Sequence, residues 1–242
     1  MKIVVCSLCH NEREMLPFFL RYYETIADII HVWDDHSDDG SRYILQGHPK
    51  VCLHDWKFAD GIDENKFLEF CYSTYPIFVG LADWVMWPDI DEFLYHPQLG
   101  LVLAEAKRDG HKILATTGFN MIHEGLPPDD GHSQIYELVK TGVPAPTYSK
   151  PVIFQPDTLI RWNRGKHRLE NTTEPAHDAG IKLLHYRYLG HDYTAAKNAR
   201  NYARCGLLSF DKSAAWTCDP YYTGEHSAQW AETMLKVAIP VL

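Results

Sequence analysis

The sequence predicts an α/β protein built on a mostly parallel sheet that is flanked by helices. Strand-like and helix-like segments alternate through the first half of the chain, which is the pattern of consecutive βαβ units. The apolar run at 84–88 indicates a strand buried on both faces. The 242 residues, 45% of them hydrophobic, are enough for a sizeable core.

The first half contains four predicted strands with helices between them. Strands are expected at 2–8, 29–33, 51–56 and in the run that ends before residue 89. Helices are expected at 11–27, 42–46 and 63–79. Apolar residues at helical spacing, Leu16, Phe19, Leu20, Tyr23 and Ile26, support the first of these helices.

The second half is less regular. Strands are expected at 112–117, 152–154 and 181–188, and helices at 101–107 and 193–208. Proline-rich and glycine-rich composition predicts loops at 124–131 and 141–151.

Three carboxylates, Asp89, Asp91 and Glu92, follow the fourth predicted strand directly. They repel one another, so holding them together without a cation is costly. Mg²⁺ and Mn²⁺ prefer carboxylate oxygens, and on a continuing strand Asp89 and Asp91 would point the same way. The alternative is a solvated acidic turn at the end of a strand.

Polar clusters follow all four strands of the first half. They lie at 9–12, 34–37, 56–60 and 89–92. Ligands of parallel sheets bind outside the carboxyl ends of the strands, so the pattern predicts a site at this edge.

Composition and missing motifs exclude several classes of protein. The net charge of −9 argues against a nucleic-acid binder. An anionic ligand would then need a metal or the basic cluster at 161–168 to bind it. Alternatively, that cluster is a basic strand exposed to solvent. The first glycine is Gly40, so no dinucleotide-binding G-x-G-x-x-G follows the first strand, and P-loop and G-x-S-x-G motifs are also missing.

The cysteines and the hydropathy pattern favour a cytoplasmic protein. The six cysteines are scattered, and no second pair completes the zinc-like spacing of Cys6 and Cys9. No run of 18 apolar residues and no signal-peptide region occurs.

Three motifs in order resemble family 2 glycosyltransferases of the GT-A fold. The opening at 2–12 ends in Asn-Glu, 33–41 is similar to the "D-D-x-S-x-D-G" loop, and 89–93 resembles the D-x-D motif in its "D-x-D-E-F" form. The second half is similar to a bacterial subgroup with a Lys-Pro strand, a Gly-x-His element at 165–167 and a His-Tyr segment at 184–188. The likeness covers roughly residues 2–230.

The resemblance implies one domain that transfers a sugar, with inversion, from a nucleotide-sugar to a glycan or lipid-linked glycan. It assigns residues 1–110 to the nucleotide-sugar, 111–192 to the acceptor and 193–242 to a helical, aromatic tail. We expect a UDP-sugar donor, Mn²⁺ or Mg²⁺ as cofactor, and a cytoplasmic location peripheral to the inner face of the membrane.

The resemblance also assigns binding residues. Expected nucleotide-sugar contacts are Cys6, Leu8, His10, Glu12, Asp35, Lys66 and Asp89. Expected metal ligands are Asp89, Asp91 and His185. Alternatively, Asp35 caps a loop and His185 is a core histidine.

An inverting transfer needs a general base, which deprotonates the acceptor hydroxyl. The short acidic motif that supplies it in most family members is not found cleanly downstream of residue 91. Candidates are Glu124, Asp129 and Asp130 in a predicted loop, or His167, because imidazole titrates near neutral pH.

Two other functions remain open at this point. A metal-dependent phosphohydrolase also uses an Asp-x-Asp pair, but on the first strand and with Thr or Val after it. A non-catalytic sugar-binding module is suggested by the 13% aromatic content, although most aromatic residues belong to cores.

Overall fold

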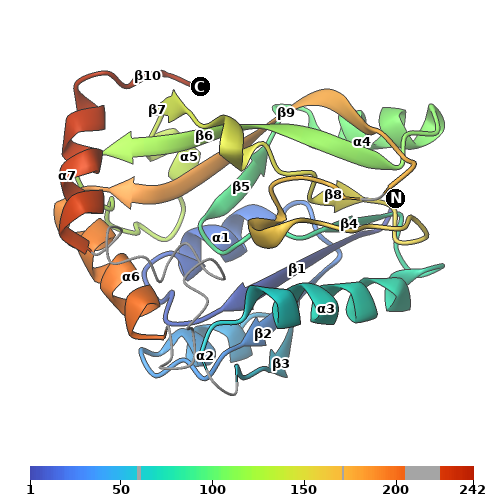
Figure 1. Ribbon diagram of the computed structural model, residues 1–242, viewed down its shortest axis with the longest axis horizontal. Helices are drawn as coiled ribbons and strands as arrows, with labels where there is room; N and C mark the ends of the chain where they lie inside the picture. The colour runs from blue at the N-terminus through green and yellow to red at the C-terminus, as the bar shows by residue number, and fades with distance from the viewer. Residues whose placement is uncertain (59–60, 171, 205–223) are drawn as a thin grey trace.

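The computed structural model describes residues 1–242 apart from 59–60, 171 and 205–223 (Figure 1). It contains one mixed sheet with helices packed on it, so the predicted α/β class is confirmed. The strand order is β10-β7-β6-β8-β4-β1-β2-β3, with β9 beside β6 and β5 beside β9. Part of the predicted 193–242 tail lies outside the described residues.

The parallel part of the sheet comes from the first half of the chain. Its strands are β1 (Ile3–Cys9), β2 (Ile29–Asp34), β3 (Val51–Asp55) and β4 (Trp84–Met86). The helices between them are α1 (Leu16–Tyr23), α2 (Ser41–Gln46) and α3 (Glu64–Thr74), which continues into η1 (Tyr75–Phe78). β1 pairs in parallel with β2 and β4, and β2 with β3, as the alternation of strands and helices predicts.

The second half adds mostly antiparallel strands. They are β5 (Glu92–Tyr95), β6 (Ile113–His123), β7 (Thr141–Pro144), β8 (Ile153–Phe154), β9 (Ala176–Leu189) and β10 (Ile239–Pro240). Here β6 and β9 are parallel, whereas β8 is antiparallel to both β4 and β6. The helical elements are α4 (Leu99–Arg108), α5 (Ile135–Leu138), η2 (Pro146–Tyr148), η3 (Arg164–Lys166), α6 (His191–Ala203) and α7 (Gly224–Leu235).

The acidic stretch lies in a turn and not on a continuing strand. β4 ends at Met86, before Pro88, which has no N–H to donate to a neighbouring strand. The Glu92 N–H then donates to the Asp89 carbonyl over 2.9 Å, and β5 leaves the turn to pair with β9. Asp89 and Asp91 are therefore placed by a tight turn between two buried strands.

Helix α1 fixes where that turn ends. Its aromatic face is buried against Phe93. The Tyr23 hydroxyl donates to the Glu92 carbonyl (2.9 Å) and accepts from the Leu94 N–H (3.1 Å), while the Tyr22 hydroxyl donates to the Leu94 carbonyl (2.7 Å). Apolar packing and buried hydrogen bonds thus hold β5 directly behind the carboxylates.

No helix among the described residues combines the length and the apolarity that a bilayer-spanning segment needs.

A glycine in β6 allows the segment around η2 to approach the sheet. The Ala145 N–H donates to the Gly118 carbonyl (2.9 Å), and the Gly118 N–H donates to the Ser149 hydroxyl (3.1 Å). A Cβ at Gly118 would lie 2.5 Å from both the Ala145 oxygen and the Tyr148 carbonyl carbon. This close approach places Tyr148 and Lys150 against the sheet.

We therefore expect Gly118→Ala to lower the free energy of unfolding by about 1–3 kcal/mol, because the added methyl group overpacks a buried contact. Urea denaturation measures it. The matched control is Gly100→Ala in α4, where a Cβ meets nothing within 4 Å and should raise stability by up to about 1 kcal/mol. Equal stabilities of the two variants would contradict the proposed packing.

Candidate active site

A cleft of about 1140 Å³ opens at the carboxyl ends of β1 and β4. Its walls come from both halves of the chain, and the helices α6 and α7 lie together on one side of the molecule (Figure 1). Predicted site residues that line it are Leu8, His10, Glu12, Asp89, Asp91, His167 and His185. The edge of the sheet predicted to hold a site thus does contain a cleft.

Asp89 faces two buried lysines. Lys166 Nζ donates to Asp89 Oδ1 over 2.7 Å, and Lys150 Nζ lies 3.0 Å from Asp89 Oδ2. Lys150 Nζ also lies 2.5 Å from Glu92 Oε1. The side chains of Lys150 and Lys166 are only 3% and 4% exposed, whereas that of Asp89 is 44% exposed. The pair of ammonium groups therefore holds a carboxylate that is open to the cleft.

Asp91 faces a third buried lysine. Lys197 Nζ, on α6, lies 3.1 Å from Asp91 Oδ2 and 2.5 Å from Glu12 Oε1. His185 Nε2 lies 3.4 Å from the same Asp91 oxygen, and its Nδ1 is 2.9 Å from Asn120 Oδ1. One ammonium group thus joins the end of β1, the acidic turn and α6.

The ion pairs around the acidic turn shift the pKa values of Asp89, Lys150 and Lys197. Burial alone would raise the pKa of Asp89, but Lys150 and Lys166 outweigh it and hold the pKa below its usual range. Burial likewise opposes the charged forms of Lys150 and Lys197, yet their carboxylate neighbours raise both pKa values. Asp89, Lys150 and Lys197 are therefore charged at neutral pH.

The resemblance implies a divalent ion bound by Asp89, Asp91 and His185, and the surroundings of their ligand atoms show whether such an ion fits. Both oxygens of Asp89 face ammonium groups, and Asp91 Oδ2 faces Lys197 and His185. Among the residues that the structure describes, the ligand atoms of His31, Cys52 and His54 come within 4.8 Å of one another, and those of Asp89, Asp91 and His185 do not form such a group. This arrangement does not fit a divalent ion on the three predicted ligands.

Asp35 is paired with an arginine. Its carboxylate accepts from Arg204, which follows α6 and lines the cleft, and from the Phe58 N–H over 3.3 Å. His10 Nδ1 contacts the Asp35 carbonyl oxygen at 2.6 Å. Asp35 therefore holds the loop after β3 through the Phe58 N–H and pairs with a cation that lines the cleft.

Asp35 is not among the residues that line the cleft, and two further predicted nucleotide contacts, Cys6 and Lys66, also lie away from the lining. The side chain of Cys6 is buried in the core beneath α3, where burial raises the pKa of its thiol. Lys66 is 62% exposed and pairs loosely with Asp63, the N-cap of α3, at 3.8 Å. On that helix it is Glu64 and Phe67 that line the cleft.

The acidic candidates for the general base are also placed elsewhere. Glu124, Asp129 and Asp130 are exposed and do not line the cleft. Asp130 accepts from the N–H groups of His132 (2.9 Å) and Ser133 (2.7 Å), and Asp129 pairs with Arg21. Asp129 and Asp130 therefore stabilise a surface turn, and His167 is the predicted candidate that lines the cleft.

A strained turn delivers Lys166 and His167 to the cleft. Gly165 and Lys166 both have left-handed backbone conformations, with φ of 74° and 61°. That conformation is unfavourable for lysine, and it turns the Lys166 side chain inward until the residue is 3% exposed. A Cβ at Gly165 would lie 2.4 Å from His167 Nε2, so local geometry requires a glycine at this position.

The sequence did not reveal Lys150 and Lys197 as site residues, whereas Lys166 belongs to the basic cluster at 161–168 that was considered for an anionic ligand. Lys150 stands in the Ser-Lys-Pro sequence, which was noted only as a motif, and Lys197 lies in a helix with no motif. The one local signal for Lys197 is its position four residues after Tyr193, on the same helix face.

Comparison with protein-family models gives no match, and comparison with curated proteins gives none either. Among solved structures, S. aureus TarS 1–349 is similar with a TM-score of 0.41 and 12% identity, over 77% of this chain and 61% of that one. A 4-diphosphocytidyl-2C-methyl-D-erythritol synthase is similar with a TM-score of 0.38 and 15% identity, over 64% of this chain and 76% of that one. The chain thus spans about three fifths of the TarS structure, and at these identities the similarity concerns the fold alone.

The environment of His167 predicts how stability depends on pH. Burial, followed by the nearby Lys150, lowers its pKa in the folded protein to about 4, against about 6.5 in an unfolded chain. Between these two pKa values the unfolded state binds more protons than the folded state. The contribution of the His167 imidazole to the free energy of unfolding is therefore complete above about pH 6.5 and is lost as the pH falls toward 4.

We expect the free energy of unfolding, measured by urea titration, to fall over this window and to fall less steeply in His167→Gln. Asp89 does not contribute there, because a carboxylate with a lowered pKa loses its stabilisation only below its unfolded value of about 3.9. Parallel curves for the two proteins would contradict the assignment.

Proposed function

We propose that this chain is a GT-A-type glycosyltransferase that takes a nucleotide-sugar as donor. The observation that carries the proposal is the set of buried ammonium groups around the acidic turn, at the strand ends that border the cleft. In a chain with a net charge of −9, local cations of this kind suit an anionic ligand such as a diphosphate. The sequence motifs at 33–41 and 89–93 support the same assignment.

In this proposal the diphosphate lies against Lys150 and Lys197, which line the cleft. An ammonium group has three N–H donors, and each of these lysines contacts two carboxylates. A donor from each is therefore assigned to phosphate oxygens. As the nucleoside diphosphate leaves, the growing negative charge is stabilised by these fixed cations.

His10 and Leu8 are assigned to the nucleoside, because they line the cleft at the end of β1. The acceptor side is assigned to the aromatic wall formed by Tyr148, Tyr188 and Trp230, since aromatic faces pack well on sugar rings. A UDP-sugar donor and a glycan or lipid-linked glycan acceptor follow from the family resemblance.

His167 is assigned as the general base. It lines the cleft beside Tyr148, with a ring-centroid separation of 5.4 Å. Its lowered pKa keeps the imidazole unprotonated at neutral pH, so a ring nitrogen can accept the proton of the acceptor hydroxyl.

The geometry disfavours a phosphohydrolase. A nucleophilic aspartate needs an oxygen directed at phosphorus, whereas both oxygens of Asp89 contact ammonium groups. A sugar-binding module without activity is distinguished by turnover, as described below.

Nucleotide binding tests the role of the lysines. Lys150→Gln should weaken UDP binding by about 10- to 100-fold, since a charge-assisted hydrogen bond is worth roughly 1.5–3 kcal/mol. Isothermal titration calorimetry measures it, and Lys66→Gln, on the exposed face of α3, should stay within about twofold of the wild type.

The same titration with EDTA should give an unchanged affinity, because the chain supplies its own cations. Loss of binding in EDTA and its return with Mn²⁺ would show that an ion carries the diphosphate instead. If Lys150→Gln does not fold, Lys197→Gln takes its place in the comparison.

Turnover tests the reaction. UDP release from a panel of UDP-sugars should be detectable with the wild type, and His167→Gln should lower kcat by about 100-fold or more with UDP affinity unchanged. The matched control is His96→Gln, which changes a histidine outside the residues that line the cleft. Undiminished kcat in His167→Gln would remove His167 as the base, and lack of turnover with every donor would favour a binding module.

A further inference from the structure

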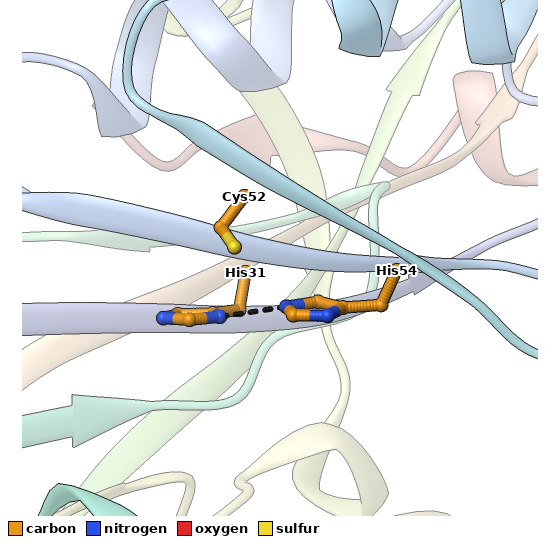
Figure 2. A group of neighbouring side chains, drawn as sticks. All are labelled: His31, Cys52 and His54. Atoms are coloured by element: carbon orange, nitrogen blue, oxygen red, sulfur yellow. Dashed lines mark hydrogen bonds between the residues drawn. The ribbon is translucent and has the colours of Figure 1, made fainter.

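Two histidines and a cysteine gather on the sheet outside the cleft lining (Figure 2). His31 comes from β2, and Cys52 and His54 come from β3. His31 is paired in register with Cys52, so the two side chains stand on the same face, and His54 follows Cys52 by two residues on that face. All three are partly buried, which leaves a path to solvent.

The ligand atoms of the three side chains lie within 4.8 Å of one another. Figure 2 shows that the rings of His31 and His54 face each other. The distance from His31 Nδ1 to His54 Nε2 is 2.8 Å, and the ring planes are 9° apart. Phe78 packs against His31 with a centroid separation of 5.0 Å, and Trp33 stacks on His54 at 4.8 Å. Aromatic neighbours therefore hold both imidazoles with the two facing nitrogens directed at each other.

The chemistry of the group suits a borderline-soft cation. The two facing nitrogens share one hydrogen bond, so one of them carries a proton and the other a lone pair. Burial, followed by His54, lowers the pKa of His31 to about 4, and neutral imidazole is the form that binds metals. Cys52 is a free thiol, and imidazole nitrogen and thiolate sulfur are the usual ligand atoms of zinc, whereas Mg²⁺ and Mn²⁺ prefer oxygen.

We propose that His31, Cys52 and His54 bind one Zn²⁺ ion, with the fourth tetrahedral position open to solvent. Tetrahedral ligands at zinc–nitrogen distances of about 2.0–2.1 Å stand about 3.3 Å apart, so binding requires the facing nitrogens to separate by about 0.5 Å from their present 2.8 Å and both rings to turn toward the ion.

The protons balance in this step. The bridging hydrogen moves to the outer nitrogen of its own ring, which leaves a lone pair on each facing nitrogen. The Cys52 thiol loses its proton to solvent as the sulfur–zinc bond forms, so about one proton is released per ion at a pH where the thiol is protonated.

The site is expected to secure the edge of the sheet. β3 is the last strand in the described strand order and pairs with β2 alone. An ion bound to both strands would resist separation of this edge strand, and this effect does not depend on the proposed glycosyl transfer.

Cobalt substitution in the full chain tests the site. Co²⁺ should give a thiolate-to-cobalt charge-transfer band that saturates at about one equivalent and disappears when Zn²⁺ is added. Calorimetry with Zn²⁺ in two buffers of different ionisation enthalpy should show release of about one proton per ion, and Zn²⁺ should raise Tm.

Variants identify the ligands. Cys52→Ser should abolish the band, and His54→Gln should abolish saturable binding at one equivalent. His177→Gln is the matched control, because it removes one imidazole from a second stacked histidine pair, His111 and His177, that lies on another part of the surface, and it should leave the band unchanged. If Cys52→Ser fails to fold, alkylation of the wild type mapped by mass spectrometry serves instead, and Zn²⁺ should protect Cys52.

A band that persists in Cys52→Ser, equal alkylation of Cys52 with and without Zn²⁺, or a lack of saturable binding would each overturn the proposal. The two histidines would then be a hydrogen-bonded pair without a metal.

Discussion

The structure depends on the neutralisation of a buried acidic turn by buried lysines. Carboxylates at the end of β4 are stable inside the protein only if cations meet them with good geometry. The cations come from three separate places: the segment after η2, the strained turn of η3, and α6. Electrostatics thus ties the irregular second half of the chain to the parallel sheet formed by the first half.

This network also explains why the site is at once rigid and open. Tyr22, Tyr23 and Gly118 fix the backbone on either side of it through hydrogen bonds and close packing. Asp89 keeps nearly half of its side-chain surface exposed, although its lysine partners are almost fully buried. A ligand entering the cleft therefore meets groups whose charge and position are set before it arrives, which is the condition for electrostatic stabilisation without reorganisation.

Local pattern was enough to predict the α/β class, the strands of the first half and the edge of the sheet where the cleft lies. Apolar runs and polar strand ends are short-range signals, and β1, β2 and β4 follow them. The repulsion among the carboxylates was recognised, but it requires only positive charge, which lysines 61 and 77 residues away from Asp89 provide. No short-range pattern encodes contacts over such separations.

Other differences have equally physical causes. Pro88 and the bond from the Glu92 N–H to the Asp89 carbonyl end β4 early, so the alternation assumed for Asp89 and Asp91 does not apply. Asp130 precedes Ser133 by three residues and bonds to its backbone, a common local pattern of turns that distinguishes it from an acid in a cleft. β8 is too short and too apolar for its direction to be read from its residues, and it is the antiparallel link between β4 and β6.

The contact of Lys197 with Glu12 and Asp91 has a consequence for where the chain can be shortened. A protein cut just before α6 would keep every described strand of the sheet except β10. It would also keep Glu12, at the end of β1, and Asp91, in the acidic turn, but not Lys197, which pairs with both. Such a fragment loses the charge balance of its interior, not merely a peripheral helix. We therefore expect the smallest independently folding unit to extend at least through α6.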